Sequence, residues 1–489
     1  MLKLSHAASS LALAGFTLAQ AAAAAPPEPD PAAAEVPEGY RVEVFADGLD
    51  FPTSVEPDGA GGLFVALSGA APGDPSARPA LLHFAADGAR RSVPVNGLEA
   101  PVNDLLMRDG ELLVSHRTKI SVLDDPLGSA PALRDLVTGL PSLGDHENNQ
   151  LTVGPDGGLY VGQGTATNSG VVGLDNKKWL MEHPDVHEIA PAPLRTRGAV
   201  FQTKDPLSDG EADETARTSA YQPFDTATPD GATIPGATKA NGTVLRFDAD
   251  GSNPSVYAWG LRNPYGLLWA GDTLYATENG MDVRGSRPVA NDLEDLYVVK
   301  RGAFYGWPDF GSGDPVTDPR FKPDGKPQPT FLMANHPPVE RPAATFPKHS
   351  SIVKLDASPG GAFGLEGQLF IAFFGHMTPR TGTPPEEHGG HRVVRFDPAT
   401  GESTTFFGPK HHSHGDGGHG DKPQAGRSDG GHGHGPGGSA GPRRPLDVRF
   451  AADGSALYVA DFGLMPMDEA GPHARPGTGV IWKITPVAD

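Results

Sequence analysis

The chain has 489 residues, of which 37% are hydrophobic, and a formal net charge of -21. This charge argues against binding to nucleic acid or to anionic membrane surfaces, and it favours small neutral molecules and cations as partners. The absence of cysteine excludes disulfides, covalent haem attachment, a lipoprotein anchor and a cysteine nucleophile.

The N-terminus has the pattern of an export signal. Lys3 supplies a positive charge, Leu11 to Leu18 are largely apolar, and Ala21 to Ala25 offer small-residue cleavage sites. We therefore expect a signal peptide over 1–25, a flexible leader over 26–38, and a bacterial periplasmic or secreted protein. A membrane anchor fits less well, because the apolar stretch is short and diluted with alanine. No later segment has eighteen consecutive apolar residues, so no membrane insertion is expected.

One short phrase recurs six times along the rest of the chain. Each copy has a turn residue, then Leu, followed mostly by an aromatic residue or Leu and by a β-branched or small residue. The copies are "GGLFVALSG" from Gly61, "GELLVSH" from Gly110, "GGLYVGQG" from Gly157, "DTLYATENG" from Asp272, "GQLFIAFFG" from Gly367 and "SALYVADFG" from Ser455. Most copies follow a segment ending in Asp-Gly, which is typical of a tight hairpin turn.

Six hairpins separated by unequal loops predict an all-β protein, a six-bladed β-propeller over 39–487. A β-sandwich with an appended domain would not explain six copies of the same phrase. The segments "YRVEVFADG" from Tyr40 and "GVIWKITP" from Gly479 are expected to share the last blade and so close the ring.

Polar residues precede most of the predicted innermost strands, and in a propeller such residues face the axis at one end. The set expected around this mouth is Thr53, Ser54, Asn103, Asp104, Asp145 to Asn149, Arg262, Asn263, His349, Ser350, Arg444 and Asp447. Converging polar groups over a packed ring indicate a ligand pocket. The run from Asp145 to Asn149 is therefore interpreted as part of a site rather than a solvated loop. For His349 and Ser350, ligand contact and a structural role stay equally open.

Two insertions interrupt the pattern. The segment 203–242 is loop-like and is expected to cover the mouth or its rim. The segment 408–441 is a low-complexity stretch of glycine and histidine, for which we expect a disordered loop rather than a metal site. Tyr305 and Trp307 are expected to pack within a blade.

Three phrases carry a family resemblance: "GDHENNQLTVGPDGGLYVGQG", "GLRNPYGLLWAGDTLYATENG" and "GAFYGWPDF". Together they resemble the soluble glucose and sorbosone dehydrogenase family, six-bladed propellers whose best-known members use pyrroloquinoline quinone and calcium. The resemblance runs from Tyr40 to Pro486 and is most specific from Gly260 to Trp307. It implies oxidation of an aldose or a related alcohol or aldehyde by hydride transfer to the quinone. Since the chain has no haem motif, electrons would pass to a separate acceptor.

The resemblance also implies roles for particular residues. His146 matches the base that removes the proton from the sugar C1 hydroxyl, a role suited to an imidazole. Arg262 and Asn263 match a pair beside the quinone carbonyls, where a guanidinium would stabilise negative charge. Gly280 and Met281 match positions whose backbone carbonyls hold a calcium ion acting as a Lewis acid on the quinone.

Other positions match in part. Glu294 or Asp295 resembles part of a second, structural calcium site, and Arg444 matches one of two cofactor-binding arginines. The second arginine is replaced by Leu446. Where the family has a cofactor-binding lysine, this chain has Phe374, Gly375 and His376, and Gln163 and Thr165 lie where an aspartate would orient the histidine. Losing two cations would weaken the binding of a quinone with three carboxylates.

Two other functions stay open at this point. A lactonase-like hydrolase would use a central divalent metal, for which Asp104, Asn149 and Asn263 are candidate ligands. A propeller that binds a sugar without catalysis would equally explain the missing lysine and arginine.

Overall fold

The computed structural model describes residues 27–69, 77–208, 215–382, 390–410, 441–468 and 471–487. The signal peptide expected over 1–25 lies outside these residues, as does nearly all of the histidine-rich segment 408–441. No helix in the described ranges combines the length and the apolar character that crossing a membrane requires.

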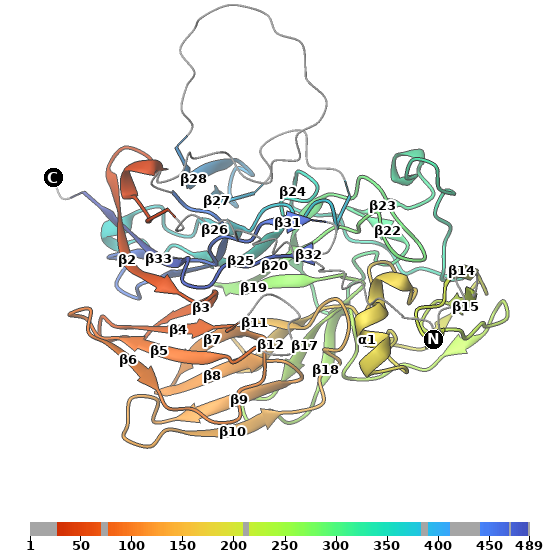
Figure 1. Ribbon diagram of the computed structural model, residues 1–489, viewed down its shortest axis with the longest axis horizontal. Helices are drawn as coiled ribbons and strands as arrows, with labels where there is room; N and C mark the ends of the chain where they lie inside the picture. The colour runs from red at the N-terminus through yellow and green to blue at the C-terminus, as the bar shows by residue number, and fades with distance from the viewer. Residues whose placement is uncertain are drawn as a thin grey trace, which may run out of the picture.

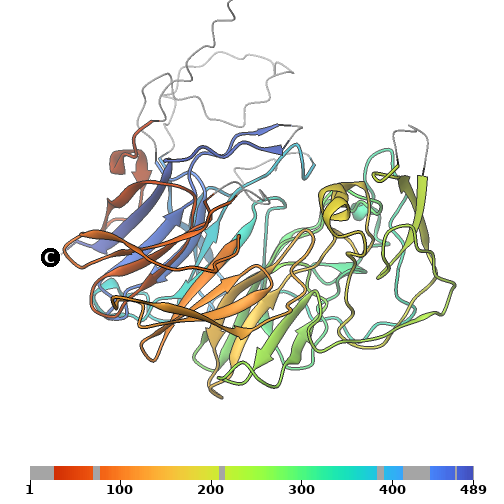
Figure 2. The ribbon, with the colours of Figure 1, turned by 60° about the horizontal axis from the view of Figure 1, so that its bottom comes forward.

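Six antiparallel sheets surround one axis, so the predicted six-bladed propeller is confirmed (Figures 1 and 2). From the axis outward, the first blade contains β3 (Pro52–Pro57), β4 (Leu63–Leu67), β5 (Ala80–Phe84) and β6 (Arg90–Val93). The second contains β7 (Val102–Arg108), β8 (Glu111–His116), β9 (Lys119–Asp124) and β10 (Ala132–Val137). The third contains β11 (Asn148–Val153), β12 (Leu159–Gln163), β17 (Thr243–Phe247) and β18 (Ser255–Trp259).

The remaining blades follow in chain order. The fourth contains β19 (Pro264–Ala270), β20 (Thr273–Glu278), β21 (Glu294–Val299) and β24 (Ala344–Phe346). The fifth contains β25 (Ile352–Ala357), β26 (Leu369–Phe373), β27 (Arg392–Phe396), β28 (Ser403–Pro409) and β1 (Ala34–Glu35). The sixth contains β29 (Pro445–Phe450), β30 (Leu457–Asp461), β33 (Gly479–Pro486) and β2 (Tyr40–Leu49).

The recurring phrase forms the second strand of every blade. Each blade is covered on both faces by its neighbours, so every residue of β4, β12, β26 and β30 is buried. A strand buried on both faces has a continuous apolar sequence rather than an alternating one. This burial explains why the phrase recurs with so little variation.

The ring closes as predicted. Strand β2 pairs with β33, with Tyr40 opposite Pro486 and Leu49 opposite Gly479, so the two ends of the chain share one blade. The expected leader differs in part, because β1 pairs with β28 and Ala34 is buried. This pairing occupies backbone groups that the edge strand β28 would otherwise leave open.

The six innermost strands, β3, β7, β11, β19, β25 and β29, each contact the next around the axis. At the axis the ammonium group of Lys354 lies 3.0 Å from Asp104 and 3.1 Å from Asp447, and all three side chains are fully buried. Arg449 lies 3.0 Å from Asp104 and 3.2 Å from Glu56. Asp104 and Asp447 therefore lie in the buried axis rather than around a mouth, and the expectation for both was wrong. They lie there because each pairs with these buried cations. We call Asp104, Lys354, Asp447 and Arg449 the axial cluster.

Neutral groups complete the connection between blades. The Ser54 hydroxyl lies 2.8 Å from Asp447 and 3.2 Å from Asp104, so it too belongs to the axis rather than to the mouth. The Gln150 side chain donates to the Leu355 carbonyl and accepts from the backbone amide of Leu267. Together these contacts tie all six innermost strands to one another.

Long insertions lie over one end of the ring. Between β12 and β17 the chain forms η2 (Leu174–Asn176), α1 (Lys177–Glu182), β13 (Leu194–Arg195), β14 (Val200–Lys204), β15 (Thr215–Ser219) and β16 (Thr233–Ile234). Between β21 and β24 it forms β22 (Phe310–Gly311), β23 (Asp314–Pro315) and η3 (Pro319–Phe321). The elements η4 (Gly361–Phe363), β31 (Met467–Asp468) and β32 (Gly471–Pro472) complete the described chain.

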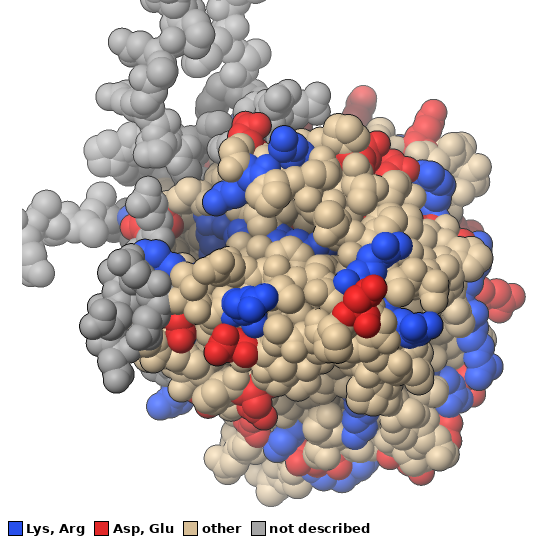
Figure 3. All heavy atoms as spheres, turned by 90° about the vertical axis from the view of Figure 1, so that its right-hand side faces the viewer, with Lys and Arg blue, Asp and Glu red and all other residues tan. Residues whose placement is uncertain are grey.

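The insertions are more ordered than their sequence suggests. The segment 203–242 is not simply loop-like, because β14 and β15 form a paired hairpin and β16 pairs with β13. The two insertions share a hydrophobic core that includes Tyr221, Phe321 and Trp307. Trp307 and Tyr305 are buried, as predicted, and each also forms a hydrogen bond to a backbone carbonyl. Figure 3 views this end of the molecule and shows a hollow with lysine or arginine atoms in its depth.

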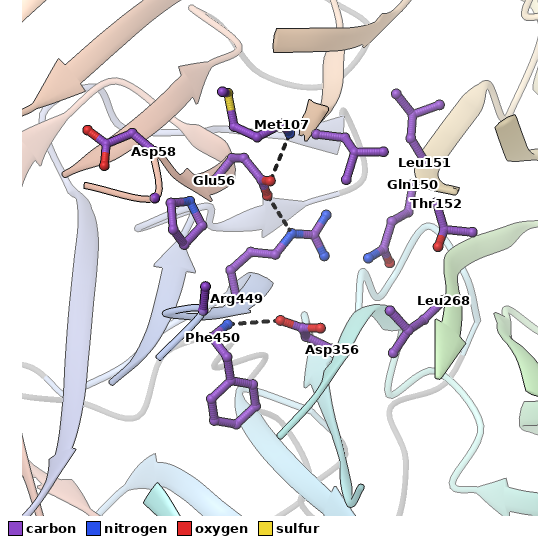
Figure 4. A pocket seen from close by; sticks show the side chains of 14 residues that line it. Glu56, Asp58, Met107, Gln150, Leu151, Thr152, Leu268, Asp356, Arg449 and Phe450 are labelled. Carbon is purple, nitrogen blue, oxygen red and sulfur yellow. Dashed lines mark hydrogen bonds and ion pairs between the residues drawn. The ribbon is translucent and has the colours of Figure 1, made fainter. Parts of the chain in front are cut away.

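The opposite end of the axis holds a cavity of about 350 Å³. Its polar lining includes Glu56, Gln150, Asp356 and Arg449, which come from the far ends of the innermost strands (Figure 4). Burial raises the pKa of Glu56 to about 8, and the Arg449 guanidinium offsets only part of this effect. None of the site residues predicted from the sequence lines this cavity.

Removal of the axial ammonium group tests the role of the axial cluster. Lys354→Ala leaves the carboxylates of Asp104 and Asp447 buried with one cation fewer, so we expect the free energy of unfolding to fall by about 3–5 kcal/mol. Lys300→Ala removes an exposed ammonium group paired with Glu340 and should cost less than about 0.5 kcal/mol. Urea unfolding of both variants measures the difference. Equal losses would contradict a special role for the axis.

The pKa of Glu56 predicts a pH dependence of stability. The carboxyl group releases its proton near pH 4.5 when unfolded and near pH 8 when folded, so its contribution to stability is lost as pH rises through this window. Between pH 5.5 and 8.5 we expect the wild type to lose on the order of 3 kcal/mol relative to Glu56→Gln. Urea unfolding at both pH values tests this, with the more exposed Glu43→Gln as control. Parallel losses in the wild type and Glu56→Gln would refute it.

Candidate functional site

The run Asp145 to Asn149 lies at the start of β11, on the side of the insertions, and its polar groups have fixed partners. The His146 Nδ1 atom lies 3.0 Å from both the backbone oxygen and the hydroxyl of Thr165. A carbonyl oxygen only accepts, so Nδ1 carries the proton and Nε2 has a lone pair. No residue in the described part of the chain bonds to Nε2. The run is thus held by fixed contacts rather than forming a solvated loop, and its role as a ligand site stays a prediction.

The imidazole stays neutral near neutral pH. Burial, and then the positive charge of Arg262, lower the pKa of His146 to about 3. A neutral imidazole with a free Nε2 lone pair is the form that accepts a proton from a hydroxyl group.

Arg262 and Asn263 lie beside His146, as the sequence predicted. Gly164 lies between His146 and Asn263, and the space there is narrow. A Cβ atom on this glycine would lie 2.3 Å from the His146 Cβ and 3.0 Å from the Asn263 Oδ1. Both backbone amides, of Arg262 and Asn263, donate to the buried carboxylate of Glu278. These two bonds fix the backbone of Arg262 and Asn263.

The Arg262 guanidinium is held mainly along one edge. Its Nη2 atom lies 2.9 Å from Asp282 and 3.0 Å from the side-chain oxygen of Asn168, and Nε donates to the Asn168 carbonyl. The other amino group, Nη1, has a single long bond of 3.4 Å to the Asn279 carbonyl. Arg262 therefore has one amino group positioned to bind a ligand, although its charge is partly neutralised by Asp282.

An ion-pair network joins this arginine to the run at β11. Arg284 lies 2.6 Å from Asp145, 2.9 Å from Asp175 and 3.2 Å from Asp282. Burial would raise the pKa of Asp282, but Arg262 and the neighbouring cations hold it well below its usual range. The sequence analysis missed Asp282 and Arg284, although they lie one and three residues after Met281 in the chain.

His349 joins the same network, and the Asn263 side chain bonds to two other asparagines. The His349 Nδ1 atom lies 3.5 Å from Asp282, which favours a structural contact over free exposure to a ligand. The Asn263 side chain accepts from Asn149 and donates to Asn279, both at 2.9 Å. Its amide is therefore engaged within the protein, and any contact with a cofactor would have to replace one of these bonds.

Arg444 lies across the ring from His146, because the third and sixth blades are opposite in a ring of six. Its guanidinium lies 4.9 Å from the centre of the Phe374 ring and makes only long bonds, of 3.3–3.4 Å, to backbone carbonyls. No carboxylate among the described residues forms an ion pair with it, and burial lowers its pKa to about 10. Arg444 is therefore a buried cation without an ion pair among the described residues, and the nearby Asp461 carboxylate, which accepts from its backbone amide, offsets only part of the effect of burial.

The structure accounts for the two missing cations. Leu446 is buried in the hydrophobic core of the fifth and sixth blades, and Phe374 packs against Phe462 while supporting Arg444. The fifth blade does contain a buried lysine, Lys354, but the axial cluster holds it. The mouth thus depends on arginine for its positive charge.

The residues predicted to bind metal separate into two groups. The Met281 side chain packs in the core of the insertions, and Glu294 accepts a 2.8 Å bond from Asn279. The predicted role of the Gly280 and Met281 backbone carbonyls as calcium ligands stays a prediction. Asp295 is buried, and its Oδ1 atom has no partner among the described residues. Burial and the nearby Asp292 carboxylate raise its pKa well above the usual value.

Asp292, which the sequence analysis missed, also lies near a possible cation site. Its Oδ2 atom accepts from the Met281 backbone amide, and its Oδ1 atom has only a 3.5 Å contact with Ser312. Within the described ranges, however, no group of three or more His, Asp or Glu side chains surrounds one point. Gly280 has its Cα packed against the Asp292–Leu293 backbone, so no side chain would fit there.

Solved structures with the same fold include two sugar dehydrogenases. The holo form of the pyranose dehydrogenase PQQ domain from Coprinopsis cinerea has a TM-score of 0.55 and 16% identity, and covers 94% of this chain and 98% of its own. The apo form of the soluble aldose sugar dehydrogenase from Escherichia coli has a TM-score of 0.51 and 14% identity, and covers 92% of this chain and all of its own. At these identities the likeness establishes the propeller fold.

Sequence comparisons point to the same family. Quinoprotein glucose dehydrogenase B from Acinetobacter calcoaceticus is 25% identical over 185 residues, which are 36% of this chain and 28% of that relative. The family model described as Glucose / Sorbosone dehydrogenase matches residues 232–377, which include Arg262, Gly280, Asp295 and Trp307. The predicted resemblance is thus confirmed, and it is carried by residues 232–377, which match the glucose / sorbosone dehydrogenase family model.

Proposed function

We propose that this protein is a sugar dehydrogenase that oxidises an aldose or a related alcohol or aldehyde, with pyrroloquinoline quinone as its cofactor. One observation carries the proposal: the mouth sets a neutral imidazole with a free Nε2 atom opposite a buried arginine that forms no ion pair with a described carboxylate. The first group suits removal of a hydroxyl proton, and the second suits an anionic cofactor.

The residues around the mouth fit an anion with several carboxylates. Arg444 would pair with one carboxylate, and the free amino group of Arg262 would bind a second polar group on the opposite side. When bound, pyrroloquinoline quinone supplies an acceptor for a hydride. Two arginines in place of a larger set of cations favour weaker binding than the family's pattern implies.

His146 would act as the general base. Oxidation of a hydroxyl-bearing carbon releases one hydride and one proton, and the proton would pass to Nε2. Thr165 would hold the Nδ1 proton meanwhile, so the ring would keep one orientation. The imidazolium formed would lie near the carboxylates of Asp145 and Asp282, which favour its positive charge.

The lactonase-like alternative is not favoured by the contacts of its candidate ligands. Asp104 pairs with Lys354 and Arg449 at the axis, and Asn149 donates to Asn263. A metal ion would have to break these bonds to gain three ligands. Binding of a sugar without catalysis would use the same mouth, and the activity measurement below separates it from oxidation.

We also propose a calcium ion between Asp292 and Asp295. Both carboxylates are buried with raised pKa values, and one of them has an unpartnered oxygen; the charges of Arg262 and Arg320 offset only part of the effect of burial on Asp292. Hard oxygen donors are the ligands that calcium prefers. Export and a separate electron acceptor are further parts of the proposal, supported by the N-terminal pattern and by the lack of a haem motif.

His146→Ala tests the oxidation. We expect dye-coupled oxidation of mixed aldoses, with pyrroloquinoline quinone and calcium added, to fall at least about 100-fold because the base is lost. Cofactor binding, followed by absorbance, should change little. His187→Ala, at an exposed histidine, serves as control and should keep full activity. Absence of cofactor binding by the wild type at tens of micromolar would overturn the proposal.

Asp295→Asn tests the calcium ion. Adding calcium to chelator-treated wild type should raise its melting temperature by several degrees, because the ion binds only the folded state. Asp295→Asn should lose most of this rise, and without calcium it should be more stable than the wild type, because a repulsive carboxylate is gone. Asp250→Asn, at an exposed aspartate, is the matched control. An equal calcium response in Asp295→Asn would contradict the assignment.

A further inference from the structure

We propose that Glu188 is a positioning residue that holds His146 in its proton-accepting orientation through the turn 165–167. This inference rests on the proposed role of His146 as base. Glu188 lies in the insertion between α1 and β13, outside the propeller strands. It touches neither the imidazole nor the open mouth, so it would act only through the backbone that holds His146.

The Glu188 carboxylate binds three donors of one turn. Its Oε1 atom lies 2.6 Å from both the amide nitrogen and the hydroxyl of Thr167, and its Oε2 atom accepts from the Ala166 amide at 3.1 Å. The side chain is only 1% exposed. A carboxylate accepts all three bonds at once, because it has two oxygens and no donor.

The same turn provides every contact of the His146 Nδ1 atom. The Thr165 carbonyl accepts from Nδ1 and also from the His146 backbone amide, each at 3.0 Å. The Thr165 hydroxyl donates to the Thr167 carbonyl at 2.7 Å, which leaves its oxygen free to accept from Nδ1. A shift of Ala166 and Thr167 would therefore move both acceptors of the imidazole.

A second contact from the same insertion supports this arrangement. The Asn241 side chain accepts from the Ile189 amide, next to Glu188, and donates to the Gly164 carbonyl at 3.0 Å. The insertion therefore holds the backbone on both sides of Thr165. These contacts hold Thr165, the residue whose two oxygens fix the His146 imidazole.

Burying the Glu188 carboxylate at this position costs free energy, so packing alone does not explain a glutamate there. No cation among the described residues pairs with Glu188, and burial raises its pKa to about 7. An apolar side chain would avoid this cost but would leave the amides of Ala166 and Thr167 buried without acceptors. Glutamine would set an amino group against an N–H or O–H donor, so it should displace the turn.

The test is nitrogen NMR of the histidine side chains in the full chain, without cofactor or substrate. The chain has 18 histidines, so the His146 signals are assigned by their loss in His146→Ala. We expect the wild type to show one tautomer, protonated at Nδ1. Glu188→Gln should show a mixture of both tautomers, whereas Glu340→Gln, which alters an exposed ion pair, should match the wild type.

Kinetics provide the second measurement. In Glu188→Gln we expect kcat to fall by about 10- to 100-fold with KM changed less than about twofold, because the base is misplaced while substrate contacts stay. Thr167→Val removes the hydroxyl bond to Glu188, together with the bond from the Gly170 amide to the same hydroxyl, but keeps both backbone bonds to Glu188, so it should produce a smaller change in the same direction. This second variant keeps the test decisive if Glu188→Gln does not fold.

The outcomes separate the two proposals. An unchanged His146 tautomer in a folded Glu188→Gln, with only a lower melting temperature, would overturn the positioning role. A wild type that oxidises no aldose, together with a tautomer change in Glu188→Gln, would refute the proposed reaction and still support the contact between Glu188 and His146.

Discussion

The structure depends on a shared ammonium group at the propeller axis. Lys354 lies between Asp104 and Asp447, and Arg449 adds a second cation to the same carboxylates. These ions are fully buried, so their mutual attraction must offset a large loss of hydration. Because the charged groups come from three innermost strands, β7, β25 and β29, these strands cannot slide relative to one another without separating buried charges. The positions of the strand ends, and so of the mouth, follow from this constraint.

The axial cluster also determines which charges the mouth can present. The buried lysine of the fifth blade is used at the axis, and Arg262 is partly neutralised by Asp282. Arg444 is left as the cation without a carboxylate partner among the described residues. A chain with a net charge of -21 therefore keeps, at one end of its axis, a buried guanidinium that pairs with no described carboxylate. This local field matters more for an anionic ligand than the net charge, because buried charges are screened little by salt.

The insertions complete the site rather than merely covering it. Asp175 and Glu188 come from the insertion of the third blade, and Arg284 comes from the loop after β20. Arg284 joins Asp145 to Asp282, so it connects the segment of His146, the proposed base, to the segment that pairs with Arg262. The propeller places His146 and Arg262 side by side, and the insertions hold their orientation.

The sequence by itself determined the six blades, the closure of the ring and the neighbourhood of His146, Arg262 and Asn263. These features are local, because a strand buried on both faces has its own apolar pattern and its first residues always face the same mouth. The partners of charged side chains were decided only by the tertiary structure. Ser54 and Asp447, for example, are 393 residues apart in sequence and 2.8 Å apart in space. For the same reason, the local sequence does not indicate the roles of Lys354, Asp292 and Glu188. The free energy of a buried charge depends on which groups the fold brings beside it.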